Sequence, residues 1–262
     1  MTLAPSPRSM ALLLTGALAC APAARAQDAG RFVRWSYADA GALARSAAPR
    51  SVALAVGGAA ILGVGMGADA PLLDEVQAGY HGPAARYLDI VNPIGGPRAV
   101  PVVAGVFAAT LATDNARLQD AAFTSFQALA YAGAVSYGIK AAAGRMRPIE
   151  GRGARHLRPF SGHSSFPSGH TTQAFAVVTP WVYYYPGPAT YGLLALSTGT
   201  AVARVARGKH WPSDVVAGAA LGFLTARSLA RRHLAQETPS RLRVEPVAGA
   251  DQAGVVLRLA LD

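Results

Sequence analysis

Six apolar segments of helical length run along most of this chain and constrain its fold more than any other feature. Breaks rich in glycine and proline separate them, as in NPIGGPR at residues 92–98 and YPGP at residues 185–188. Apolar runs of this length with turn residues between them predict an all-α bundle of about six core helices. The predicted helices cover residues 51–68, 99–113, 121–139, 171–185, 189–205 and 215–230.

Charged residues are scarce, at 15% of the chain, whereas hydrophobic residues make up 52%. Average soluble proteins carry about 25% charged residues, so these helices are either embedded in a membrane or packed unusually closely through small side chains. Several predicted helices contain polar residues and are shorter than the roughly 20 apolar residues of a typical span. Both alternatives stay open, and we expect the protein to associate with a membrane.

The first 26 residues have the three parts of an export signal. Arg8 supplies the charged start, residues 10–19 form the apolar core, and the sequence ARA at residues 24–26 precedes a predicted cleavage point. The apolar core is short for a membrane span, although an uncleaved anchor is the alternative. The single cysteine, Cys20, lies inside this segment, so the mature chain would have no thiol chemistry.

The rest of the chain divides into three parts by composition. Residues 27–50 are polar and dotted with arginine, and they could form an amphipathic helix. Residues 51–235 hold the predicted helical domain. In the tail, residues 236–262, polar and apolar residues alternate on both sides of a turn, which predicts a short β-hairpin.

Basic residues and histidines fall into three groups, and each group lies at an end of a predicted helix. If consecutive helices run antiparallel with short connections, all three groups lie at one end of the bundle. Every member is a residue type that binds an anion or carries out acid, base or nucleophilic chemistry. The members are Lys140, Arg147, Ser168, Gly169, His170, Arg204, His210 and Asp214.

The cations in these groups have few carboxylates near them in the sequence, which is typical of an anion site. The planar fork of an arginine matches two phosphate oxygens. A helix that starts at Ser168 and Gly169 would add backbone N–H groups and a favourable dipole, although Ser168 could also serve only as a helix cap. Because the basic clusters lack interleaved aromatic residues, we do not expect nucleic acid as a partner.

The two histidines complete a plan for phosphoryl transfer. One imidazole could attack phosphorus while the other protonates the departing oxygen. Asp214 follows His210 by four residues and could hold one nitrogen of that ring, as the acid of a serine triad does. The surrounding positive charge would stabilise the transition state.

Three motifs, taken together and in order, resemble the signature of the type 2 phosphatidic acid phosphatase family. Its superfamily includes bacterial class A acid phosphatases and vanadium haloperoxidases. The resemblance extends over about residues 73–231. The motifs are Lys140-x6-Arg147-Pro148, Pro167-Ser168-Gly169-His170 and Arg204-x5-His210-x3-Asp214.

The resemblance implies a role for each motif residue. His210 would be the nucleophile that forms a phosphohistidine, Asp214 would orient it, and His170 would be the general acid. No metal ion is implied. One position departs from the family pattern, because Ala203 stands where a serine usually precedes the arginine, which removes a possible hydrogen bond. The implied phosphate ligands are Lys140, Arg147, Ser168, Gly169 and Arg204.

The expected function is therefore a metal-independent phosphatase for phosphate monoesters or diphosphates, with lipid phosphates as the expected substrates. The alternatives are a vanadate-dependent haloperoxidase, with vanadate as its cofactor, a soluble periplasmic acid phosphatase of broad specificity, and a non-catalytic anion-binding protein. The export signal and the resemblance together predict a place in the bacterial cell envelope. The active site would face the periplasm from the inner membrane, or the protein would be soluble in the periplasm.

Several polar residues near the motifs receive no catalytic role. His163 is interpreted as part of a loop or of the substrate rim, and His156 with its neighbouring arginines as either a solvated loop or a contact to an acidic head group. Asp69 and Asp74 fall in the loop after the first predicted helix and have no assignable role.

Overall fold

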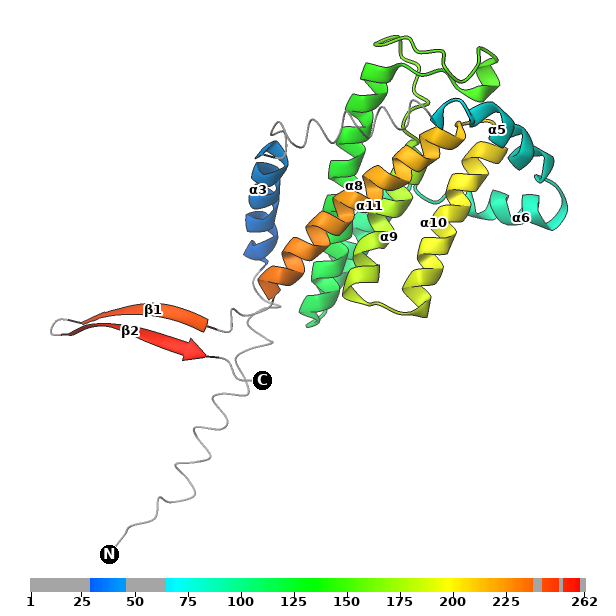
Figure 1. Cartoon of the computed structure of the whole chain (residues 1–262). Coiled ribbons are helices and arrows are strands. Elements are labelled where there is room, and N and C mark those ends of the chain that lie inside the picture. Colours follow the sequence, from blue (N-terminus) through cyan, green and yellow to red (C-terminus); the bar gives the residue numbers. More distant parts are fainter. Residues whose placement is uncertain (1–28, 46–64, 238–241, 250–251, 260–262) are drawn as a thin grey trace, which may run out of the picture.

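A computed structural model describes residues 29–45, 65–237, 242–249 and 252–259 of the chain. The described helices form an all-α body, as predicted, and two strands follow it (Figure 1). The export signal, Cys20 and most of the predicted helix 51–68 lie outside the described residues. The elements are α3 (Gly30–Arg45), α5 (Asp69–Ala78), α6 (Gly82–Val91), α7 (Ala99–Thr110), α8 (Ala116–Ala143), a 3-10 turn η1 (Pro148–Glu150), α9 (Gly169–Tyr184), α10 (Pro188–Ala206), α11 (Pro212–Glu237), β1 (Leu242–Gly249) and β2 (Gln252–Leu259).

Helices α7 to α11 correspond to five of the six predicted helices, and α3 lies within the polar segment 27–50. The strands β1 and β2 pair antiparallel, with Leu242 opposite Leu259. Helices α5 and α6 occupy a region that was interpreted as a loop, which is a correction. Each has only 10 residues and buries few apolar side chains, such as Leu73 and Leu88, so neither produces a long apolar run.

Helix α9 lies among α8, α10 and α11, and small residues bring these helices close together (Figure 1). Ala128 and Ala132 of α8 meet Ala176 of α9 in one fully buried cluster. A β-carbon on Gly222 of α11 would lie 2.2 Å from the carbonyl oxygen of Thr172, so only glycine permits this approach. Close packing through alanine and glycine therefore accounts for the low charge content.

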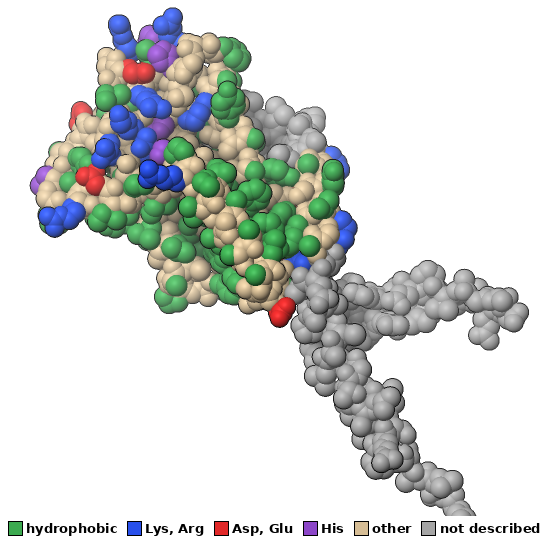
Figure 2. Space-filling model, turned by 180° about the vertical axis from the view of Figure 1, so that it is seen from behind, with side chains coloured by type: hydrophobic (Ala, Val, Ile, Leu, Met, Phe, Trp, Pro, Cys, Tyr) green, Lys and Arg blue, Asp and Glu red, His purple; other side chains and the backbone are tan. Residues whose placement is uncertain are grey.

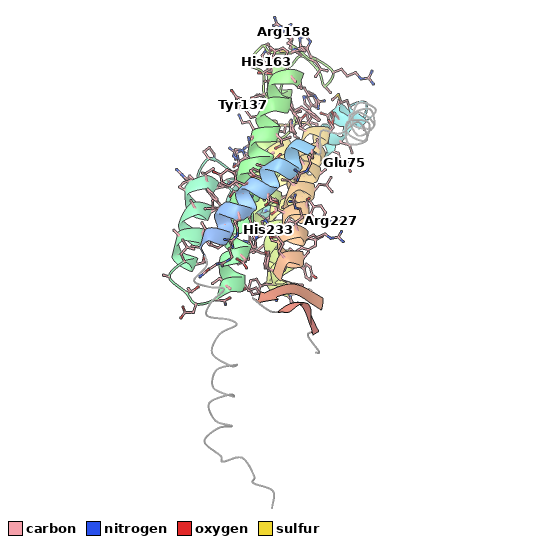
Figure 3. All side chains as sticks on the ribbon, turned by 90° about the vertical axis from the view of Figure 1, so that its left-hand side faces the viewer. Glu75, Tyr137, Arg158, His163, Arg227 and His233 are labelled. Carbon is pink, nitrogen blue, oxygen red and sulfur yellow. The ribbon has the colours of Figure 1, made fainter. Side chains whose placement is uncertain are left out.

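Helix α3 packs on α8 and α11 through buried ion pairs. Arg31 Nε donates to Asp120 at 2.8 Å, and Asp39 accepts from His233 Nε2 at 2.8 Å. The ring of Trp35 stacks on His233 with 4.0 Å between centroids. Figure 3 shows His233 well away from the loop that carries His163, so α3 stabilises the bundle at a distance from the three motifs.

Hydropathy does not identify a membrane-spanning helix in the described ranges: none is both long and apolar enough.

Candidate active site

The structure brings the three motif groups together at one end of the bundle. Lysine, arginine and histidine side chains gather there on one face, above a surface of hydrophobic side chains (Figure 2). Burial and the nearby charges of Arg204, His210, Arg147 and Lys140 together lower the pKa of His170 to about 4. The chain therefore assembles a cationic cluster from three separate helix ends.

His210 and Asp214 lie together at the start of α11. The Nδ1 atom of His210 is 3.5 Å from Asp214 Oδ2, and the two side chains are 3% and 0% exposed. This is an ion-pair distance without hydrogen-bond alignment. Burial lowers the pKa of His210 to about 4, although Asp214 opposes the shift. At neutral pH the ring is neutral, with Nδ1 on the Asp214 side and Nε2 as the nitrogen that can attack.

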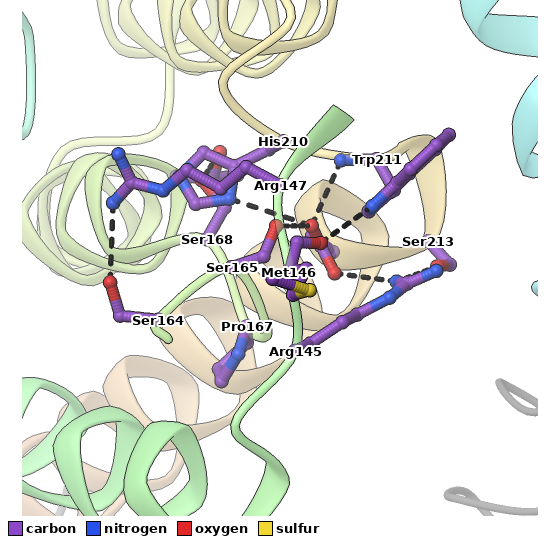
Figure 4. A network of polar contacts seen from close by, with 12 residues as sticks. Arg145, Met146, Arg147, Ser164, Ser165, Pro167, Ser168, His210, Trp211 and Ser213 are labelled. Atoms are coloured by element: carbon purple, nitrogen blue, oxygen red, sulfur yellow. Dashed lines mark hydrogen bonds and ion pairs between the residues drawn. The ribbon is translucent and has the colours of Figure 1, made fainter. Parts of the chain in front are cut away.

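Asp214 is fixed by several donors in addition to His210 (Figure 4). Its Oδ2 accepts from the hydroxyl of Ser165 and from the backbone N–H of Trp211 at 2.9 Å. Its Oδ1 accepts from Arg145 Nη1 at 2.6 Å. Burial alone would raise the pKa of Asp214, but the adjacent imidazole of His210 and the charge of Arg145 hold it below its usual value. Asp214 therefore stays ionised and cannot rotate freely.

Arg145 connects Asp214 to a second buried carboxylate, Asp69 at the start of α5. Arg145 Nη2 donates to Asp69 Oδ2 at 2.6 Å, and both side chains are at most 1% exposed. Asp69 also accepts from the backbone N–H of Ser213 at 2.8 Å and from its hydroxyl at 2.7 Å. Two carboxylates thus share one guanidinium, which removes the cost of burying unpaired charge. Arg145 and Asp69 are positioning residues that the sequence did not reveal.

Lys140 ties the end of α8 to the segment before α9. Its Nζ donates to the carbonyl oxygen of Ser164 at 2.7 Å and to that of Pro167. An ammonium has three donors, so one remains for a ligand. Burial lowers the pKa of Lys140 to about 8; Asp214 opposes this shift, whereas Arg147 and Arg204 add to it.

Arg147 and Arg204 supply most of the remaining positive charge. Arg147 Nη2 donates to the Ser164 hydroxyl at 3.2 Å, and Arg204 Nη1 donates to Asn92 Oδ1 at 3.1 Å. The buried Nε of Arg204 has no hydrogen-bond partner among the described residues. Burial and the charges of Arg147 and Arg207 together lower the pKa of Arg204 to about 10. A bound anion would satisfy the buried donor and relieve this repulsion.

Ser168 does not cap α9, and its backbone N–H is already used. Its side chain makes no capping hydrogen bond and instead accepts from Thr171 Oγ1 at 3.0 Å. Its N–H donates to the backbone oxygen of Asp214 at 2.9 Å. This corrects the expectation that Ser168 would offer its backbone donor to a phosphate. The donors at this helix start are those of Gly169 and the residues after it, because the first N–H groups of a helix have no intrahelical partner.

The imidazole of His170 lies against the connection between α6 and α7. A β-carbon on Gly96 would be 3.0 Å from His170 Nε2, and one on Gly95 would be 2.1 Å from the His170 carbonyl oxygen. The sequence NPIGGPR was interpreted only as a break between helices. It also holds Arg204 through Asn92, so it is part of the site.

The remaining candidates lie at the edge of the site. His163 Nδ1 pairs with Glu150 Oε1 at 3.3 Å, and both side chains are partly exposed. Arg152, Arg155 and His156 line an open hollow of about 500 Å³ on the loop after α8. Ala203 is fully buried and packs with Leu88 and Val91 instead of supplying a hydrogen bond. No three metal-binding side chains come together in the part of the chain that the structure describes.

Comparison with known proteins agrees with this architecture. Residues 121–237 match the model of the PAP2 superfamily, and they extend from α8 to the end of α11. This segment contains all the motif residues, from Lys140 to Asp214. It is a PAP2 superfamily domain, and the resemblance inferred from the three motifs is confirmed.

Curated relatives of the chain include three lipid A 1-phosphatases. Those of Rhizobium johnstonii and Rhizobium etli are each 36% identical to the chain over 115 residues, which is 40% of this chain and 47% and 49% of theirs. The lipid A 1-phosphatase of Porphyromonas gingivalis is 36% identical over 84 residues, 31% of this chain and 17% of its own length. The chain thus spans about half the length of the two Rhizobium proteins. No solved structure matches.

Proposed function

We propose that the protein is a phosphatase that hydrolyses the phosphate monoester of a lipid through a phosphohistidine on His210. The observation that carries this proposal is the buried, neutral imidazole of His210, which lies beside Asp214 and near the cations Lys140 and Arg204. The PAP2 domain and the three lipid A 1-phosphatases support it and make lipid A 1-phosphate the first candidate substrate.

Binding would use charges that the protein holds in place before the substrate arrives. Arg147, Arg204 and Lys140 would contact the phosphate oxygens, together with N–H groups at the start of α9. The same groups would stabilise the additional charge of the five-coordinate transition state. Their neighbours fix their positions, so little reorganisation is needed during the reaction.

The chemistry would follow in two steps. His210 Nε2 forms a bond to phosphorus as the bond to the lipid oxygen breaks, and His170 gives that oxygen its proton. A water molecule then attacks phosphorus while His170 takes up its proton, the P–N bond breaks, and inorganic phosphate and free His210 are released. The pKa of His170 is about 4 in the free protein, and the negative phosphate beside it would raise this pKa so that it can carry the proton.

A phosphate-release assay on lipid A, phosphatidate and soluble phosphate esters, with detergent and with EDTA, tests this proposal. We expect release from a lipid phosphate that survives EDTA. If no phosphate ester is turned over, the anion-binding alternative gains support. Bromide oxidation that depends on added vanadate would support the haloperoxidase alternative, and equal turnover of all soluble esters would support the acid phosphatase of broad specificity.

The lowered pKa values of His210 and Lys140 predict a loss of activity at acid pH and weaker substrate binding at alkaline pH. Protonated His210 cannot attack, so kcat/KM should fall as the pH drops through about 4. Lys140 loses its charge as the pH rises through about 8, so KM should rise there. Steady-state kinetics over this range measures both. Lys140→Arg should move the alkaline change to higher pH, because arginine stays charged; an unchanged profile in this variant would contradict the assignment.

We also propose that the protein is exported and works at the inner membrane with its site facing the periplasm. The export signal at residues 1–26 and the exposed apolar residues Ile90, Val100 and Val102 support this. Amino-terminal sequencing of the mature protein should begin at Gln27, and the protein should float with phospholipid vesicles. A mature protein that starts at Met1 would contradict cleavage of the export signal. A protein that stays with the soluble fraction would contradict its place at the membrane.

A further inference from the structure

We infer that an apolar slot beside His170 receives a hydrocarbon chain of the lipid from which phosphate is removed. The inference rests on the proposed function, and it adds where the leaving group lies and which part of it is recognised. The slot is a cavity of about 310 Å³ between the α6–α7 connection, α7 and α9. Its walls are Pro93, Ile94, Gly95, Arg98, Ala99, Val102, Val103, Ala174, Val177 and Val178.

The lining of the slot suits a hydrocarbon chain. Valine, alanine, isoleucine and proline make up most of it, and Arg98 is its one charged residue. A sugar or a polar head group there would lose hydrogen bonds to water without replacing them. The volume lies at the lower end of the range for small-molecule sites, roughly 300–1,000 Å³, which fits a single chain.

The slot lies next to the start of α9, which carries the general acid. Gly95 is one of its walls, and a β-carbon on Gly95 would be 2.1 Å from the His170 carbonyl oxygen and 3.1 Å from Ala174 Cβ. The neighbouring Gly96 lies against the imidazole, with 3.0 Å from its added β-carbon to His170 Nε2. In the proposed reaction the leaving oxygen meets this imidazole. A hydrocarbon chain carried by the group on that oxygen would therefore start near the slot.

The surface outside the slot is apolar as well. Val102 on α7 is 61% exposed, and Val100 and Val106 on the same helix are 48% and 42% exposed. Figure 2 shows hydrophobic side chains directly below the cationic end of the bundle on the same face. A chain that leaves the slot would thus stay on apolar surface. The arrangement places the phosphate among cations and its lipid tail along α7.

Binding of n-alkylphosphonates, from ethyl to octyl, tests the slot without any turnover, because their C–P bond is not cleaved by hydrolysis. Isothermal titration calorimetry would give the affinity of each. In the unmodified protein we expect the affinity to rise by about fourfold per methylene until the slot is full, as expected for burial of apolar surface. Val177→Phe and Val102→Phe would fill the slot, so they should abolish this rise.

The matched control is Val33→Phe, which adds the same ring at an exposed valine of α3, away from the slot and from α7. It should keep the dependence on chain length. Ethylphosphonate should bind equally well to all four proteins, which shows that each is folded with an intact anion site. An affinity that does not rise with chain length in the unmodified protein, or that rises equally in Val177→Phe, would overturn the inference. Phosphate release from lipids could still occur in either case, so the proposed function is judged separately.

Discussion

Replacement of His210 by alanine is expected to lower the rate of phosphate release by roughly 10⁴-fold or more, as loss of a nucleophile does in other covalent mechanisms. The side chain is 3% exposed, and its Nδ1 atom lies 3.5 Å from Asp214 Oδ2. Since the cations stay in place, the variant should still bind phosphate. The measurement is kcat on the best lipid substrate, together with the dissociation constant of inorganic phosphate.

His163→Ala is the control for this variant. His163 is also an imidazole on the active-site side of the bundle, but it is partly exposed and pairs with Glu150. Figure 3 shows it at the end of the bundle, in the loop with Arg158. Its loss should change kcat by less than about tenfold, because surface pairs contribute little. An active His210→Ala protein would refute the assignment of the nucleophile.

Replacement of Arg145 by alanine is expected to cause the largest loss of stability. The change leaves the carboxylates of Asp69 and Asp214 buried without their cation. Removing one partner of a buried ion pair costs about 3–5 kcal/mol. For a chain of this size the loss corresponds to a decrease of roughly 6–20 °C in Tm, which thermal unfolding measures.

The same change should also reduce activity, because Asp214 would lose the donor that holds its Oδ1 atom. Arg145→Lys restores the charge and should recover part of both Tm and kcat, whereas Arg155→Ala, in the exposed loop, should alter neither. If Arg145→Ala unfolds at the temperature of the unmodified protein, the buried network is not the structural support described above.

The bundle and the meeting of the three motifs could be predicted from the sequence, because both depend on local patterns. Long apolar runs define α8 to α11, and helices joined by short connections must alternate in direction. The ends that carry Lys140, His170 and His210 therefore meet. The short helices α5 and α6 could not be predicted, since each is held by a few buried residues such as Leu73 and Val91.

The support of the site depends on contacts between distant segments, and no local pattern encodes them. Asp69 meets Arg145 across 76 positions of sequence, and Asn92 meets Arg204 across 112. In the sequence, Arg145 is one basic residue among several. Its burial, which depends on distant segments, is what distinguishes it. The two glycines of NPIGGPR predict only a turn. The residue that packs against them, His170, lies more than 70 positions further along the chain, so the sequence does not indicate this contact.

The central claim is that His210 carries the phosphoryl group, and trapping of that group tests it most directly. The protein would be mixed with lipid A radiolabelled in its 1-phosphate, quenched within one turnover, and digested for peptide mapping. We predict a label that is stable to alkali, labile to acid and located on His210, and that is missing from His210→Ala. A label on another residue, or turnover of substrate with no labelled protein at any time, would contradict the account.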